Sequence, residues 1–167
     1  MVEEGRIKYV SLIIALLIVG ITLFLMVGVY FRIFKFHILY EEFYYHHWFT
    51  WIGTAYIAFA TPAYYLLKRH YPNSFKTFLY IHVFGNLLAF MLISIHFTQE
   101  ASRSNIVLGT GIVLYAVIIT LVSTGFLLRF SPPKKFWGKS IRYIHTAVTL
   151  SFYLIIIVHI LHGVNII

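Results

Sequence analysis

Two pairs of histidines in this sequence share one spacing. His82 and His96 are 14 residues apart, and so are His145 and His159. Fourteen residues of α-helix rise about 21 Å and complete nearly four turns, so each pair presents two imidazoles on one helix face at two depths. Imidazole is a common ligand of transition metals. The spacing therefore predicts two levels of metal coordination, each drawing on more than one helix.

The histidine pairs lie within long apolar segments. The chain has 167 residues, of which 60% are hydrophobic and only 11% are charged, against roughly 25% charged residues in soluble domains. About 20 apolar residues cross the hydrocarbon core of a bilayer. We therefore predict an all-α membrane protein, a single domain of residues 1–167, with five transmembrane helices at Tyr9–Phe31, His47–Leu67, Phe78–Thr98, Ile106–Leu128 and Tyr143–Ile166. The first segment is expected to be a retained helix, since it lacks the small-residue cleavage site of a signal peptide.

Basic residues are divided unevenly between the two sides of this predicted bundle. Ten belong to the side that holds the N-terminus, namely Arg6, Lys8, Lys68, Arg69, Lys76, Arg129, Lys134, Lys135, Lys139 and Arg142, and three to the other side, Arg32, Lys35 and Arg103. Because short cytoplasmic loops are enriched in Lys and Arg, we expect a multi-pass protein of the cell membrane with a cytoplasmic N-terminus. The same distribution accounts for the net charge of +8 without a nucleic acid as partner.

In this topology the third and fifth helices run in the same direction. His82 and His145 then share the inner level, while His96 and His159 share the outer level. Zinc and copper sites need three or four protein ligands, whereas haem iron needs only two axial imidazoles because the porphyrin supplies four nitrogens. Since the chain has no cysteine, covalent c-type attachment is excluded, and we predict two non-covalent b-type haems. The alternative is that each histidine merely forms hydrogen bonds between helices.

Further residues fit this interpretation. Gly111 and Gly125, in the fourth predicted helix, are also 14 residues apart. Glycine lets either a macrocycle or a neighbouring helix approach the backbone closely. Arg142, one turn before His145, is a candidate partner for a propionate of the inner haem, as Arg103 is for the outer haem, although both also fit as interfacial cations. We expect a four-helix haem-binding bundle plus one N-terminal helix.

Other histidines compete for the outer site. His162 is three residues after His159 and shares its helix face. It is therefore either a rival ligand or a residue that bonds the ligand rather than the metal. His46 and His47, at the start of the second predicted helix, lie at the same level. Segment 40–47 is rich in Tyr, Glu and His, which is typical of an interfacial belt. The alternative hypothesis is a quinone site over the outer haem in which Glu42 and His47 accept protons.

The pairs His82-x13-His96 and His145-x13-His159 carry a resemblance to two groups of bis-histidine membrane cytochromes. One is the ferric reductase-like and NADPH oxidase-like transmembrane domain, whose pairs lie on the third and fifth helices of a chain with its N-terminus inside. The other is the N-terminal haem bundle of cytochrome b of the bc complexes. The first group matches the predicted topology better.

The resemblance covers about Phe78 to Ile166. In cytochrome b, glycines lie opposite the haems, which looks like Gly111 and Gly125. The chain departs from both groups, because it has no second half with a quinol-oxidation motif and no sixth helix followed by a flavin and nicotinamide domain. Whether the chain is an enzyme by itself is therefore left open.

Two stacked haems imply electron transfer across the membrane. We expect the cytochrome b subunit of a respiratory or quinone-linked oxidoreductase, in contact with lipid and with a quinone or with flavin, iron-sulfur or cytochrome c subunits. The alternative is a small transmembrane reductase of iron, oxygen or superoxide that works with a separate flavin subunit, since no phosphate-binding glycine motif is present. A transporter is disfavoured, because all five acidic residues lie outside the apolar segments.

Overall fold

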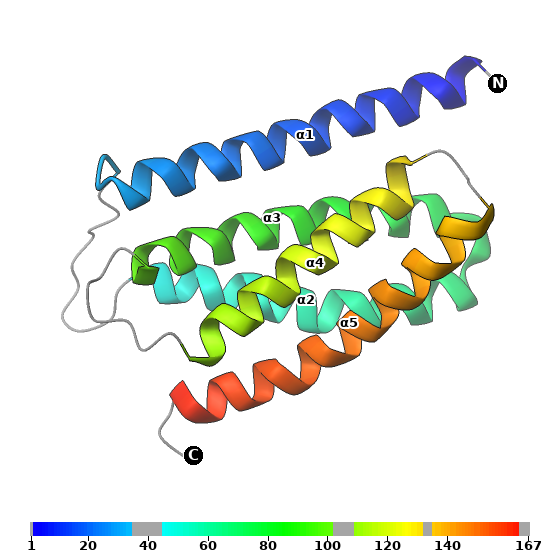
Figure 1. The fold of residues 1–167 in the computed structure, drawn as a ribbon. Coiled ribbons are helices and arrows are strands. Elements are labelled where there is room, and N and C mark those ends of the chain that lie inside the picture. Colours follow the sequence, from blue (N-terminus) through cyan, green and yellow to red (C-terminus); the bar gives the residue numbers. More distant parts are fainter. Residues whose placement is uncertain (1, 35–44, 102–108, 132–134, 164–167) are drawn as a thin grey trace. The chain divides into compact units, whose positions relative to one another are not determined.

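The computed structural model describes residues 2–34, 45–101, 109–131 and 135–163. These residues form five α-helices and one short 3₁₀ helix, η1, and no strand (Figure 1). In chain order the elements are α1 (Val2–Tyr30), α2 (Tyr45–His70), η1 (Pro72–Ser74), α3 (Phe75–Ala101), α4 (Thr110–Phe130) and α5 (Lys135–Gly163). The predictions of an all-α chain and of five long helices are confirmed.

Four segments of helix are long and apolar enough to cross a membrane. They are Ile7–Tyr30, Pro72–Ala101, Thr110–Phe130 and Gly138–Leu161. Large apolar side chains on them are open to the surroundings, such as Phe24 at 65% and Leu154 at 69% exposure. Apolar surface of this extent is unfavourable in water and favourable in lipid. α2 is less apolar and ends in a basic turn, so its crossing of the membrane remains a prediction.

The helix ends differ from the predicted segments. α1 begins at Val2 and α5 at Lys135, several residues before the first and fifth predicted segments. Backbone hydrogen bonding continues beyond the apolar residues into the polar flanks, which a search for apolar residues alone does not detect. α4 begins later than predicted, at Thr110, because the backbone of Gly109 is not helical, with φ −84° and ψ −136°.

The backbone contacts group the chain into two compact units, residues 1–106 and 107–167. The first unit contains α1, α2 and α3, and α3 packs against both of the others. Figure 1 shows α1 lying along α3. The buried core of this unit includes Leu87, Phe90 and Ile93 on α3.

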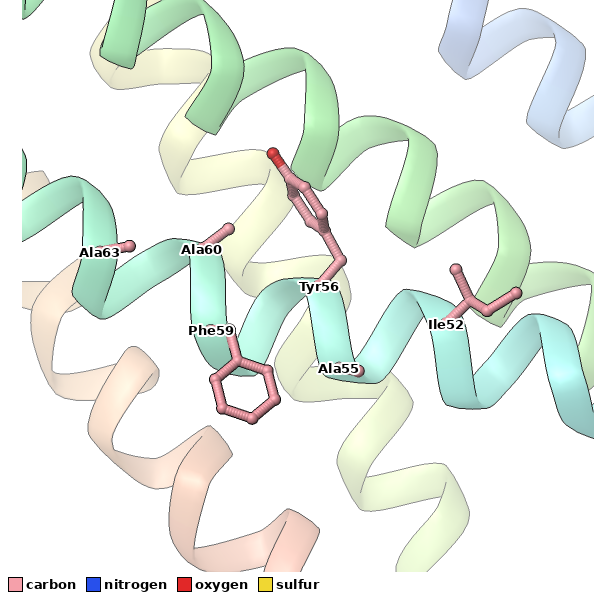
Figure 2. Close-up of a pocket in the computed structure, with 6 residues that line it drawn as sticks. All are labelled: Ile52, Ala55, Tyr56, Phe59, Ala60 and Ala63. Carbon is pink, nitrogen blue, oxygen red and sulfur yellow. The ribbon is translucent and has the colours of Figure 1, made fainter.

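Glycines allow α2 and α3 to approach closely. A Cβ atom on Gly53 of α2 would lie 2.9 Å from the carbonyl oxygen of Ala89 on α3. A Cβ atom on Gly85 of α3 would collide with the ring of Tyr56. The Tyr56 hydroxyl donates a 2.8 Å hydrogen bond to the carbonyl oxygen of Ile81, and Figure 2 shows this side chain reaching toward α3. Both glycines therefore serve helix packing.

α2 also carries a shallow apolar groove beside Tyr56 (Figure 2). Its volume is about 600 Å³, and it is lined by Ile52, Ala55, Tyr56, Phe59, Ala60 and Ala63. Three of these residues are alanines, whose short side chains leave the hollow. Its nearly wholly apolar lining suits hydrocarbon rather than a polar ligand.

The second unit contains α4 and α5, packed as an antiparallel pair. Ile118 of α4 and Phe152 of α5 are almost completely buried, at 2% and 0% exposure. Phe152 lies midway between His145 and His159 in the sequence of α5.

Candidate functional site

Two histidines of α5, His145 and His159, pair with threonines of α4. The Nδ1 atom of His145 lies 2.8 Å from the Oγ1 atom of Thr124. The Nδ1 atom of His159 lies 2.9 Å from the Oγ1 atom of Thr110. The two threonines are 14 residues apart, as the two histidines are, so an identical contact repeats in one antiparallel register. Each ring uses Nδ1 for a hydroxyl, so Nε2 is the ring nitrogen that would ligate a metal.

A glycine follows each of these threonines and meets the same ring. A Cβ atom on Gly125 would lie 3.4 Å from Cε1 of His145, and one on Gly111 would lie 3.6 Å from Cε1 of His159. The 14-residue glycine spacing noted in the sequence thus belongs to the histidine contacts. Each level of this unit consists of a Thr-Gly dipeptide from α4 and a histidine from α5.

His82 on α3 has a different environment. Its Nδ1 atom lies 3.2 Å from the Nδ2 atom of Asn86, one turn along the helix. Its ring stacks on the ring of Tyr64 from α2, with centroids 4.5 Å apart and planes inclined by 19°. The Lys68 ammonium lies 5.1 Å from the centre of the same tyrosine ring. An amide and an aromatic face therefore hold this imidazole.

Asn86 is relevant because its amide can be turned over. Its Oδ1 atom is buried and has no hydrogen-bond partner within the described part of the chain. Turning the amide would bring Oδ1 to Nδ1 of His82, where it accepts the ring proton and leaves Nε2 for a metal. Three of the four candidate ligands, His82, His145 and His159, thus have a side-chain partner at Nδ1.

His96 lies half-buried on α3, close to its C-terminal end. The helix runs without interruption from Phe75 to Ala101, as α5 does from Lys135 to Gly163. Each predicted pair of histidines is therefore carried by one continuous helix, and the expected four-turn relation between its members holds.

The remaining predicted residues contribute less. Arg142 is exposed on α5, one turn before His145. His70 is the last residue of α2, and its Nδ1 atom lies 3.0 Å from the carbonyl oxygen of Leu66. Arg103 and Glu42 lie outside the described residues, and the side chains of His46, His47 and His162 are not described either.

Sequence reasoning missed Thr110, Thr124, Asn86 and Tyr64. A signal for the threonines was present, because each directly precedes one of the glycines and repeats their spacing. Asn86 was detectable as the polar residue one turn after His82. The stacking of Tyr64 depends on how α2 packs against α3, which no local pattern reveals.

The donor set favours a metal that brings ligands of its own. Nowhere in the described ranges do three or more His, Asp or Glu side chains gather as a bare metal ion would require. Single imidazoles with an engaged Nδ1 suit axial ligation of haem iron. No protein-family model, curated protein or solved structure matches the chain.

Proposed function

We propose that this chain transfers electrons across a membrane by means of two non-covalent b-type haems. The observation that supports this most is the repeated contact of α5 with α4, in which His145 and His159 each give Nδ1 to a threonine hydroxyl. Histidines that ligate metals characteristically use the second ring nitrogen for such a hydrogen bond. Two intramembrane histidines with the same partners in the same register point to two similar sites.

The second ligand at each level comes from α3 in this proposal. His82 joins His145 at the inner level, and His96 joins His159 at the outer level, because both pairs have the same 14-residue separation. Two imidazoles complete the coordination of a haem iron, and bound haem supplies a one-electron couple at each level. The protein sets axial ligation, burial and hydrogen bonding, which tune the redox potential.

The surrounding residues suit this role. The long apolar helices exclude water, and the glycines next to Thr110 and Thr124 accept the imidazole edges. Arg142 is exposed near the N-terminal end of α5, which is the inner level in this proposal, and it suits a haem propionate. The resemblance to bis-histidine cytochromes supports the same assignment, with the chain as the cytochrome b subunit of a respiratory or quinone-linked oxidoreductase.

Haem content tests the proposal directly. The purified protein should yield about two extractable haems per chain in a pyridine haemochrome assay, because each level supplies one pair of axial imidazoles. His145→Ala should lose one haem and keep the other, since the two levels are about 21 Å apart along the helix. His70→Ala is the matched control, because this histidine ends α2 and its Nδ1 atom bonds the carbonyl oxygen of Leu66 in its own helix.

The outcomes are distinct. A wild-type protein without haem would refute the proposal. Loss of one haem from the His70 variant as readily as from the His145 variant would show that histidine removal acts through folding, and the assignment of His145 as a ligand would fall. Retention of two haems by the His145 variant would exclude that histidine as well.

A further inference from the structure

The hydroxyl of Thr124 has partners of two kinds, the backbone carbonyls of Thr120 and Leu121 and the ring of His145. Its Oγ1 atom is 2.7 Å from the carbonyl oxygen of Thr120, 3.1 Å from that of Leu121 and 2.8 Å from Nδ1 of His145. A hydroxyl has one proton, and a carbonyl oxygen can only accept. When the hydroxyl donates its proton to a carbonyl, it can only accept from the imidazole, and this arrangement requires the hydrogen on Nδ1 of His145.

We propose that Thr124 is a positioning residue that keeps His145 in the Nδ1-protonated tautomer, with the lone pair of Nε2 available to iron. This inference rests on the proposed function, because the role of the tautomer is to prepare a metal ligand. It assigns a purpose to a residue that no spacing of histidines indicates.

A merely structural bond between α4 and α5 explains the contact less well. Thr124 is buried at 8% exposure, and its hydroxyl already donates its proton to a carbonyl oxygen of its own helix. The bond to His145 therefore serves the imidazole, which gains an acceptor for its Nδ1 proton. Gly125 leaves room for the same ring, because a Cβ atom there would lie 3.4 Å from Cε1 of His145. A threonine bond beside a glycine recurs at His159.

The hydrogen bond has a predictable electronic effect. An imidazole that donates its Nδ1 proton is more basic at Nε2 and binds the oxidised metal more strongly. Replacing Thr124 by Val keeps the shape and removes the acceptor oxygen. The affinity for the inner haem should fall about 10- to 100-fold, the usual effect of losing such a partner, and its midpoint potential should become more positive.

The experiment compares Thr124→Val, Thr124→Ser and Thr120→Val in the full-length haem-loaded protein. Thr120 makes the same bond within its helix, 2.9 Å to the carbonyl oxygen of Ala116, but is exposed, which makes it the matched control. Haem retention, the midpoint potentials and the electron paramagnetic resonance of the ferric haems are measured. We expect a shift for Thr124→Val, wild-type values for Thr124→Ser, and no change for Thr120→Val.

Failure of this inference and failure of the proposed function give different results. Unchanged potentials and spectra in Thr124→Val, with loss of the inner haem from His145→Ala, would overturn the positioning role alone. An equal shift in Thr120→Val would overturn it too. A wild-type protein without haem would refute the proposed function. In that case nitrogen NMR of ¹⁵N-histidine still tests the tautomer, because protonation of His145 at Nε2 would contradict the role of Thr124.

Discussion

Gly125 and Gly111 set how closely α4 can approach the imidazoles of α5. The distances from a Cβ atom to the rings, 3.4 Å and 3.6 Å, correspond to contact without overlap. A methyl group therefore fits beside each ring, while a branched side chain does not. Each glycine position has room for a methyl group but not for a larger side chain. Substitutions of increasing size at one of these positions therefore test the contact.

Substitution of Gly125 should have two different outcomes. Gly125→Ala should keep the inner haem, since its methyl group only reaches the edge of His145. Gly125→Val adds two further methyl groups, which displace the ring, and overpacking of this kind usually destabilises by about 1–3 kcal/mol. We expect this variant to lose most of its inner haem in an absorption titration. Gly20→Val is the control, because nothing lies within 4 Å of a Cβ atom there. Equal haem retention by both valine variants would contradict the role given to Gly125.

At the scale of single residues, the candidate histidine ligands were predicted from the sequence. The threonines that bond them were not predicted. A histidine in an apolar segment is conspicuous, because an ionisable group in lipid needs an explanation. Threonine in such a segment is ordinary, since it can bond the backbone of its own helix, as Thr98 and Thr146 do. The glycine that follows each of them and the packing of α4 against α5 distinguish Thr110 and Thr124 from the other threonines.

At the scale of elements, the apolar segments predicted the helices well because each helix satisfies its own backbone in lipid. The contacts between helices were harder to predict from the sequence than the helices themselves. From sequence alone, a lone glycine such as Gly53 or Gly85 fits a cofactor as well as a neighbouring helix. The structure places the Tyr56 ring over Gly85 and Ala89 against Gly53, which identifies both as packing positions between α2 and α3.

Gly85→Ala should destabilise the first unit. Its methyl group would overlap the Tyr56 ring and break the bond from the Tyr56 hydroxyl to the Ile81 carbonyl. We expect a loss of about 1–3 kcal/mol, measured by denaturation in detergent. Tyr56→Ala in the same chain should recover part of the loss, because residues in contact are not additive. Additive effects of the two substitutions would show that the overlap is absent.

At the scale of the whole molecule, the crossing of α2 and the orientation of the chain remain to be tested. The uneven distribution of Lys and Arg predicts a cytoplasmic N-terminus, and this places the start of α2 outside and its end inside. Trp48 and His70 are exposed residues close to the two ends. They are separated by 22 residues, which is about 33 Å of helix, enough to cross the hydrocarbon core.

Cysteine labelling can measure both properties, because the chain has no cysteine of its own. Trp48→Cys should react with a membrane-impermeant maleimide in intact cells. His70→Cys should react only after permeabilisation, since it follows the basic residues expected inside. Reaction of both variants in intact cells would mean that α2 does not cross the membrane. The opposite pattern would invert the predicted orientation.

The two threonine contacts fasten α4 to α5 at two heights, and this affects how the pair responds to its lipid. Sliding one helix past the other by a turn, about 5.4 Å, would break the bonds of His145 and His159 together. In a bilayer that is thinner than the helices are long, α4 and α5 must then tilt together as one rigid pair. The separation of the two imidazoles along α5 stays constant, while their depths below the membrane surfaces change. Lipid thickness should thus alter exchange with partners at the surfaces and leave transfer between the two levels unaffected.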